Sequence, residues 1–380
     1  MVAAVHPYKL GVIGCGRVFR WPYMSLIQQL RIRGQLDEIV ACDSNPAVSE
    51  HVVGQPGVVK FTTDHREVLD DPDIDIVMVL TSMPEHGPLA KDALLAGKHV
   101  LVEKPMAITL PEAAELVELA KTSAGHLVCA PFVILSPTFQ AMWRHVTGGD
   151  IGRPTLARGR YGWAGPDWGP WFYQAGGGPL FDLGVYNVTA LTALLGPVQR
   201  VSAFTGKVHG QRLVDGRMID VQTPDNYQIL LDFGGSVLAT VTTGFSMQQY
   251  RSPAVEIYGT EGTVQMLGDD WAPQGHELWQ NSEGAWRLYG SPNPSWPWTS
   301  GLQHLVESVA AGTKPLVAPE HAYHVLEVML GAIASGEDGR HHEVTSTFPA
   351  VSFAAGETGA GETGAGAAAH RVHDRTHASR

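Results

Sequence analysis

Gly14-Cys15-Gly16 directly follows the apolar run KLGVI, at a point where a strand is expected to turn into a helix. Glycines at such a turn let the backbone approach a pyrophosphate, which the amides at the helix N-terminus then bind. The full dinucleotide fingerprint has glycine or alanine three residues later, whereas Phe19 stands at that position here. The turn alone is therefore as compatible with a simple tight strand–helix turn as with a dinucleotide site.

Asp43 ends a second apolar run, EIVAC, and lies 27 residues after Gly16. An acid at the end of the second strand hydrogen-bonds the adenosine ribose hydroxyls and repels a 2′-phosphate. The carboxylate therefore favours NAD and disfavours NADP, although Arg17 could reach a phosphate. An acid that merely begins a loop is the alternative, and the neighbouring glycines favour the cofactor role.

Glu103-Lys104-Pro105 follows the apolar run HVLV, so the lysine is expected at the carboxyl end of a buried strand. In open α/β sheets, ligands bind at that edge. A partly desolvated lysine suits proton transfer or the polarisation of a hydroxyl, and Glu103 could anchor the amine or contact the nicotinamide side. A lysine at the end of a strand is usually only solvated. This motif alone therefore does not indicate a functional site, and the other motifs must support it.

Asp182 and Tyr186 are spaced i, i+4, which places both side chains on one face of a predicted helix. The three glycines at 176–178 let the chain turn tightly into that helix. A carboxylate and a phenol that converge near Lys104 would form a proton relay, because a phenol needs a nearby cation to act as a base near neutral pH. A tyrosine that packs its ring and keeps its hydroxyl at the surface is the alternative.

Aromatic residues crowd the segment 161–173, and Trp163 and Trp171 are the candidate substrate contacts among them. Flat rings suit the apolar faces of pyranoses, but they also fill protein cores. The sequence favours neither use over the other.

The elements that must position these residues alternate at first between strands and helices. Such alternation predicts a parallel sheet with helices on both faces, here over residues 1–130. After residue 131 strand candidates crowd together, which predicts a second α/β domain, residues 131–349, with a largely antiparallel open sheet. Strands are expected before Gly14 and at 38–43, 75–81, 98–103, 126–130, 155–161, 198–209, 226–233, 236–245, 253–258 and 262–266, and helices at about 22–33, 88–96, 110–124, 136–147, 301–312 and 319–336.

Composition excludes several classes of protein. The 380 residues carry a net charge of −12, from 38 acidic and 26 basic side chains, so no binding to nucleic acid is expected. The three cysteines lie far apart and form no CxxC, which predicts neither disulfides nor a zinc site and favours a cytoplasmic location. No apolar run approaches the roughly 20 residues of a membrane span, and no signal peptide or membrane association is expected.

Residues 350–380 are predicted to form a disordered tail. The unit GETGA repeats there, and the segment lacks the large apolar groups that would offset the entropy of ordering it. His370, His373 and His377 are interpreted as part of a solvated tail, and no metal site is expected.

Taken in order, the motifs resemble the glucose–fructose oxidoreductase / inositol dehydrogenase / rhizopine-catabolism (Gfo/Idh/MocA) family over about residues 8–345. They are the GxG turn, Thr81 to His86, AGKHVLVEKP at 96–105, IGRP at 151–154 and GGGPLFDLGVY at 176–186. The resemblance implies an N-terminal Rossmann domain that binds NAD or NADP. It also implies a C-terminal α/β domain whose open sheet covers the nicotinamide and often forms an oligomer interface, so a homodimer or homotetramer is expected.

The resemblance also implies roles for single residues. Lys104 is expected beside the reacting carbinol, where Tyr186 takes the hydroxyl proton and Asp182 holds the relay. His86 is expected to buttress the cofactor loop. The substrate is expected to contact Lys104, Trp163, Trp171, Asp182 and Tyr186, and the cofactor Gly14, Cys15, Gly16, Arg17, Val18, Asp43, Thr81, Ser82, His86, Glu103 and Lys104.

These expectations describe an NAD-dependent oxidoreductase that transfers hydride between nicotinamide and a carbinol carbon of a sugar, cyclitol or glycoside. The alternative is an NAD-dependent glycoside hydrolase that acts by transient C3 oxidation, elimination and water addition. A non-enzymatic NAD sensor is a third class, and the presence of Lys104, Asp182 and Tyr186 together argues against it.

Overall fold

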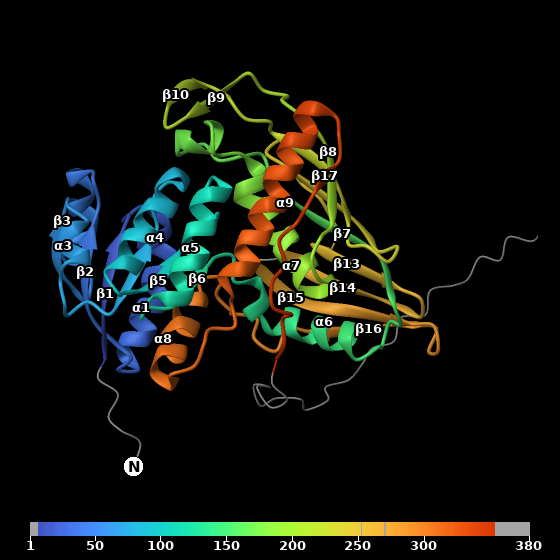
Figure 1. Cartoon of the computed structure of the whole chain (residues 1–380), viewed down its shortest axis with the longest axis horizontal. Coiled ribbons are helices and arrows are strands. Elements are labelled where there is room, and N and C mark those ends of the chain that lie inside the picture. Colours follow the sequence, from blue (N-terminus) through green and yellow to red (C-terminus); the bar gives the residue numbers. More distant parts are fainter. Residues whose placement is uncertain (1–6, 252, 270, 354–380) are drawn as a thin grey trace, which may run out of the picture.

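A six-stranded parallel sheet forms the N-terminal domain of the computed structural model, which describes residues 7–251, 253–269 and 271–353 (Figure 1). The strands lie in the order β3-β2-β1-β4-β5-β6, so the direction of winding reverses between β1 and β4. The inner strands β4 and β5 are almost wholly buried, because helices cover both faces and select apolar side chains. Ligands of such sheets bind outside the carboxyl ends of the strands at this reversal.

The strands of this domain are β1 (Tyr8–Ile13), β2 (Leu36–Cys42), β3 (Val58–Thr62), β4 (Ile76–Val79), β5 (His99–Val102) and β6 (Leu127–Cys129). Its helices are a π-helical turn (Phe19–Tyr23), α1 (Met24–Ile32), α2 (Ser49–Val52), α3 (Arg66–Leu69), α4 (His86–Leu95) and α5 (Leu110–Thr122). The five predicted strands are confirmed, whereas β3 was missed. It lies at the sheet edge with exposed side chains, so it lacks a continuous apolar run.

A nine-stranded sheet forms the second domain, in the order β16-β15-β14-β13-β7-β12-β11-β8-β17. Its described neighbours pair antiparallel except β7 and β12, which confirms the predicted largely antiparallel sheet. Gly234 and Gly235 lie in the connection between β11 and β12, which pair as an antiparallel hairpin. A separate hairpin, β9–β10, lies at the top of the view, to the left of this sheet, and was not predicted (Figure 1).

The strands of the second domain are β7 (Pro154–Gly162), β8 (Arg200–Gly206), β9 (Gln211–Val214), β10 (Arg217–Asp220), β11 (Asn226–Asp232), β12 (Leu238–Gly244), β13 (Val255–Gly259), β14 (Gly262–Asp269), β15 (Ala272–Gln280), β16 (Ala285–Gly290) and β17 (His342–Glu343). Its helices are α6 (Pro137–Thr147), a π-helical turn (Leu180–Gly184), α7 (Val185–Leu195), α8 (Gly301–Ala311) and α9 (Pro319–Asp338).

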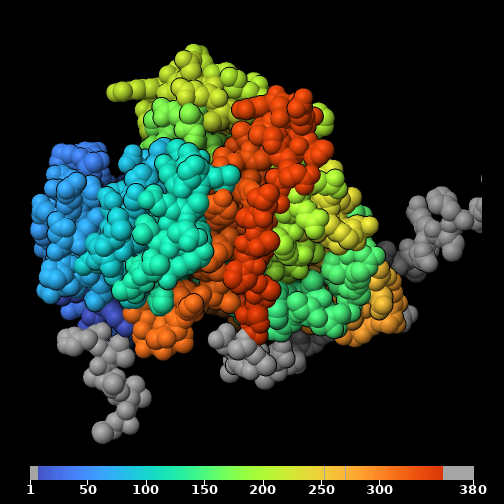
Figure 2. Space-filling view, in the orientation of Figure 1, coloured from blue at the N-terminus to red at the C-terminus, as the bar shows by residue number. Residues whose placement is uncertain are grey.

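Helices from the C-terminal part of the chain couple the two domains. α9 packs on β8 of the second domain and on α5 of the first, and α8 packs on β5 and β6. In the space-filling view α9, in red, runs between the cyan helices of the N-terminal domain and the green and yellow second domain (Figure 2). This packing fixes the carboxyl ends of β5 and β6 against the second domain.

The packed chain extends slightly beyond the predicted boundary at residue 349. Val351 and Phe353 pack against the core, and the ring of Phe353 meets that of Trp143 edge-on with centroids 5.0 Å apart. The packed structure therefore reaches at least Phe353, because this ring packs on α6 and Val351 packs against the core. The rest of the predicted tail, with His370, His373 and His377, lies outside the described residues.

Within the described ranges, no helix is long and apolar enough to cross a bilayer, and no group of three or more His, Cys, Asp or Glu side chains is arranged to hold a metal. Cys15, Cys42 and Cys129 are all buried free thiols.

Four buried histidines predict a loss of stability in acid. Burial lowers the pKa of His86 and His324 to about 4 and that of His276 and His321 to about 3. An unfolded histidine titrates near pH 6.5, so below that pH the unfolded chain binds protons that the folded chain does not. Each histidine then lowers the free energy of unfolding by up to about 1.4 kcal/mol per pH unit. We therefore expect the Tm to fall steeply between pH 6.5 and pH 4.5 in thermal melts.

The matched variants for this prediction are His321→Gln and His51→Gln. The first keeps a polar partner for Thr192, whose Oγ1 lies 2.7 Å from His321 Nε2, and should flatten the pH dependence. The second replaces an exposed histidine and should leave it unchanged. A Tm that stays constant from pH 7 to pH 5 would contradict the prediction.

Candidate active site

A groove of about 860 Å³ opens at the carboxyl ends of β1, β2, β4 and β5. Its size lies within the range of about 300–1,000 Å³ that is usual for small-molecule and cofactor sites. Of the predicted cofactor residues, Gly14, Gly16, Arg17, Val18, Asp43, Thr81, Ser82, His86, Glu103 and Lys104 line it. The second domain closes one side with Trp168, Gly169, Trp171, Phe172 and Asp215.

The two glycines of the turn after β1 serve different purposes. Gly14 has a φ of +96°, and a Cβ there would lie 2.6 Å from the carbonyl carbon of Leu80, so the fold itself requires glycine. A Cβ on Gly16 would meet nothing within 4 Å. The open space above Gly16, beside the first amides of a helix, fits a bound pyrophosphate. Phe19, at the third fingerprint position, is fully buried at the start of the π-helical turn.

Asp43 lies beside this turn and is held by two backbone amides. Its Oδ2 accepts a hydrogen bond from Cys15 N at 2.9 Å, and its Oδ1 accepts one from Asn45 N at 2.9 Å. Each oxygen keeps a second lone pair, which fits the ribose hydroxyls of NAD. Cys15 is fully buried, so it contributes through its backbone amide.

His86 connects two loops at the edge of the groove. Its Nδ1 lies 2.7 Å from Pro105 O and its Nε2 lies 3.1 Å from Thr81 O, and the ring is 1% exposed. Burial lowers the pKa of His86 to about 4, while the two carbonyl contacts act in the opposite direction. The position agrees with the buttressing role expected from the sequence.

Lys104, Asp182 and Tyr186 come together although they lie in different domains. Lys104 Nζ donates to Asp182 Oδ1 at 2.7 Å, with the two side chains only 14% and 12% exposed. The same Nζ lies 5.9 Å from the ring centroid of Tyr186, whose ring also meets that of Tyr161 edge-on. Asp182 lies in the π-helical turn and Tyr186 in the first turn of α7, so the predicted single α-helix is interrupted there.

Glu103 does not anchor the Lys104 amine, which was one of its two expected roles. Its Oε1 accepts a hydrogen bond from Tyr23 Oη at 2.8 Å, and its Oε2 accepts one from the backbone amide of Lys104 at 3.2 Å. Asp182 holds the ammonium instead. Glu103 therefore fixes the backbone of the loop that carries Lys104.

The aromatic segment covers the groove, and the β9–β10 hairpin fixes it in place. Asp215 Oδ2 accepts from Gly169 N at 3.1 Å, and Asp215 N donates to Asp167 O at 2.8 Å. The guanidinium of Arg17 lies 5.0 Å from the ring centroid of Trp168, which joins the two domains across the groove. Trp171 lines the groove, whereas Trp163 is 42% exposed and lies outside its lining.

Sequence reasoning missed Trp168, Phe172 and Asp215 as groove residues. The first two belong to the crowded aromatic segment, where the spacing does not show which rings face a ligand. The only signal for Asp215 is the Asp215-Gly216 pair, which is typical of a hairpin turn.

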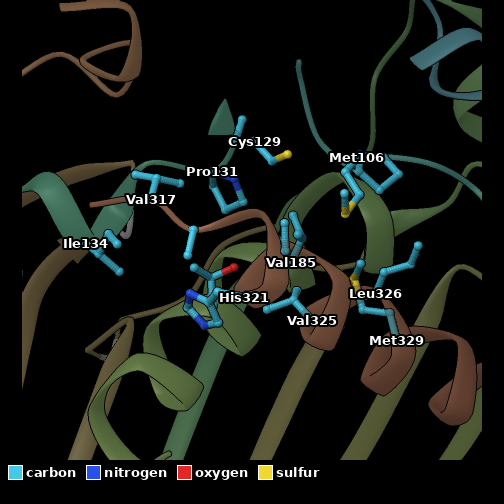
Figure 3. Close-up of a pocket in the computed structure, with 15 residues that line it drawn as sticks. Met106, Cys129, Pro131, Ile134, Val185, Val317, His321, Val325, Leu326 and Met329 are labelled. Carbon is cyan, nitrogen blue, oxygen red and sulfur yellow. The ribbon is translucent and has the colours of Figure 1, made fainter. Parts of the chain in front are cut away.

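A small cavity, shown in Figure 3, has Pro105 in its lining and shares no lining residue with the groove. It is enclosed mainly by apolar side chains such as Met106, Val185 and Met329, together with His321. Its volume of about 20 Å³ accommodates about one water molecule, so this cavity is too small for a sugar-sized substrate.

A Rossmann groove that ends at a lysine–carboxylate pair from two domains defines a nucleotide-dependent oxidoreductase, and comparisons with known proteins agree. Residues 8–129 match the oxidoreductase family with an NAD-binding Rossmann fold, and residues 139–265 match the GFO/IDH/MocA C-terminal domain. The chain belongs to the GFO/IDH/MocA family of NAD-binding oxidoreductases.

The relatives include several named dehydrogenases. The chain is 30% identical to trans-1,2-dihydrobenzene-1,2-diol dehydrogenase of Mus musculus over 66% of its own length and 70% of that protein. It is 24% identical to the NAD-dependent scyllo-inositol 2-dehydrogenase of Bacillus subtilis strain 168, over 88% and 95% of the two chains. The fold also matches levoglucosan dehydrogenase in complex with NADH and levoglucosan, with a TM-score of 0.79, 20% identity and 89% and 99% coverage.

Proposed function

We propose that the protein oxidises a secondary alcohol on a ring-shaped substrate, a sugar, cyclitol or glycoside, with NAD as the acceptor. The observation that carries the proposal is the contact of Lys104 with Asp182 and Tyr186 at the edge of the NAD groove. The named relatives support the substrate class, because dihydrobenzenediol, inositol and levoglucosan all carry hydroxyls on six-membered rings. The rings of Trp171 and Phe172 offer flat walls for such a substrate.

Bound NAD supplies the hydride acceptor, and the side chains handle the proton. Lys104 polarises the hydroxyl oxygen of the substrate, and Asp182 holds the ammonium in place. Tyr186 accepts the hydroxyl proton as the carbinol carbon is oxidised, since the nearby ammonium stabilises its phenolate. The second domain excludes water from these groups, which strengthens their electrostatic interactions.

The direct test is a panel of free sugars, cyclitols and nitrophenyl glycosides, each incubated with the enzyme and NAD. Steady accumulation of NADH with a free sugar or cyclitol is the expected result. Release of nitrophenol without net NADH would instead indicate the glycoside hydrolase. Tight NAD binding with no turnover of any compound would contradict both activities.

Trp168 provides a prediction for cofactor release. Trp168→Leu removes the ring beside Arg17 and opens one wall of the groove, so we expect the NAD dissociation constant to rise about fivefold, mainly through faster release in stopped-flow measurements. Trp286→Leu is the control, because Trp286 contacts Trp279 between β15 and β16, outside the groove lining. Equal release rates for the two variants would show that Trp168 does not hold the cofactor.

We further propose that the enzyme is a cytoplasmic homodimer or homotetramer that associates through the outer face of the nine-stranded sheet. Leu156, Phe204, Leu230 and Leu238 are exposed there, and Leu156 and Leu238 are neighbours in the register of β7 and β12. The buried free thiols support a reducing compartment. Light scattering after size exclusion should show an oligomer that Leu230→Asp converts to smaller species.

A further inference from the structure

Tyr23 is a fully buried tyrosine that does not belong to any motif of the sequence. It ends the π-helical turn that follows the GxG motif. Its hydroxyl donates to Glu103 Oε1 at 2.8 Å, and its ring meets that of Trp298 edge-on with centroids 5.8 Å apart. These contacts fix the hydroxyl, so the nucleotide-binding turn is connected directly to the loop that carries Lys104.

Glu103, the partner of Tyr23, has the surroundings of a carboxylate. The residue is only 6% exposed, yet each of its oxygens accepts a hydrogen bond, one from Tyr23 and one from the amide of Lys104. Of these two partners, a protonated carboxyl could donate only to the hydroxyl oxygen of Tyr23, and the buried hydroxyl proton of Tyr23 would then lose its acceptor. Burial raises the pKa of Glu103, whereas the Lys104 ammonium and the two donors act in the opposite direction.

The charged and titratable groups around Glu103 come from five segments of the chain. They are Tyr23 from the first π-helical turn, Lys104 from the loop after β5 and Asp182 from the second π-helical turn. Tyr186, in the first turn of α7, interacts electrostatically with Tyr23, and His86, at the start of α4, interacts with Lys104. With Glu103 and Asp182 ionised and Lys104 protonated, this cluster carries one net negative charge.

The cluster lies at the nicotinamide end of the groove. Asp43 takes the adenosine ribose beside β2, so the other half of a dinucleotide must extend across the β1–β4 reversal toward β4 and β5. Glu103 and Lys104 line the groove at the end of β5. The nicotinamide ring carries a positive charge in NAD⁺ and none in NADH, so the net charge of the cluster discriminates between them.

We infer that Tyr23 is a positioning residue that keeps Glu103 ionised, and that the resulting negative charge makes the site prefer NAD⁺ over NADH. The inference rests on the proposed function for the placement of Lys104 and Asp182 at the nicotinamide. Its test measures cofactor binding alone, so it gives a result even if no alcohol in the panel is oxidised.

The experiment compares Tyr23→Phe with the unmodified enzyme by calorimetric titration with NAD⁺ and with NADH between pH 6 and pH 8.5. Removal of one donor from Glu103 should let it take up a proton at the acid end. We expect the preference for NAD⁺ to fall about tenfold at pH 6 and to recover at pH 8.5, since a unit charge several ångströms from the ring is worth at least this factor in a partly buried site. The unmodified enzyme should show little change in this ratio.

Two further variants keep the test decisive. Glu103→Gln retains an acceptor for Tyr23 but removes the charge, and should lower the preference for NAD⁺ at every pH. Tyr227→Phe removes another buried hydroxyl, on β11, and should leave the ratio unchanged. Equal weakening of NAD⁺ and NADH in Tyr23→Phe at all pH values would show a merely structural role and overturn the inference, as would an unaltered ratio in Glu103→Gln.

Discussion

Replacement of Lys104 by alanine should lower kcat by about three orders of magnitude, because a positioned acid–base group typically contributes about 10²–10⁴-fold. Among the ion pairs of the described residues, Lys104 is the only cation that contacts Asp182, and the variant removes it. The variant also removes the positive charge beside the ring of Tyr186. NAD should still bind, because the GxG turn and Asp43 lie at the other end of the groove, and the loss of a positive charge beside the nicotinamide should tighten the binding of NAD⁺ relative to NADH. Steady-state kinetics and NAD titration measure the two effects separately.

Lys91→Ala is a suitable control for this variant. Lys91 also pairs with a carboxylate, Glu115, at 2.6 Å, but it lies half-exposed on α4. Its removal should change neither turnover nor NAD binding, because exposed ion pairs contribute little. Since Asp182 loses its partner in Lys104→Ala, the fold of that variant should be checked by its Tm. A folded Lys104→Ala enzyme with near-normal turnover would exclude the proposed mechanism.

The N-terminal domain could be predicted closely because its inner strands are buried on both faces. Apolar runs such as IVMV and HVLV are a direct result of that burial. The edge strand β3 and the short β9–β10 hairpin expose most of their side chains, so their sequences contain no such run. The packing of Phe353 on α6 could not be predicted either, since it depends on a surface formed by distant residues.

The active site could also be predicted only in part from the sequence. Residue type and local spacing, together with the family resemblance, selected Lys104, Asp182 and Tyr186, and the structure brings them together. The partners of Glu103 and the groove positions of Trp168 and Asp215 depend on how the two domains pack. The π-helical turn at Asp182 could not be predicted from the i, i+4 spacing either, because that spacing assumes a regular α-helix.

Gly16→Ala should weaken NAD binding roughly a hundredfold while the Tm stays unchanged, a difference of about 2.7 kcal/mol in binding free energy. A Cβ at this position would meet no protein atom within 4 Å, so the folded chain accommodates it and only a pyrophosphate in that space would clash. Gly210→Ala is the matched control, since a Cβ there also meets nothing within 4 Å but lies in the second domain, outside the groove lining.

Gly14→Ala should differ from both by destabilising the fold, because its Cβ would lie against Leu80 at a positive φ. If Gly16→Ala bound NAD as tightly as the unmodified protein, the pyrophosphate could not cross this turn, and the placement of the nicotinamide beside Lys104 would have to be rejected with it.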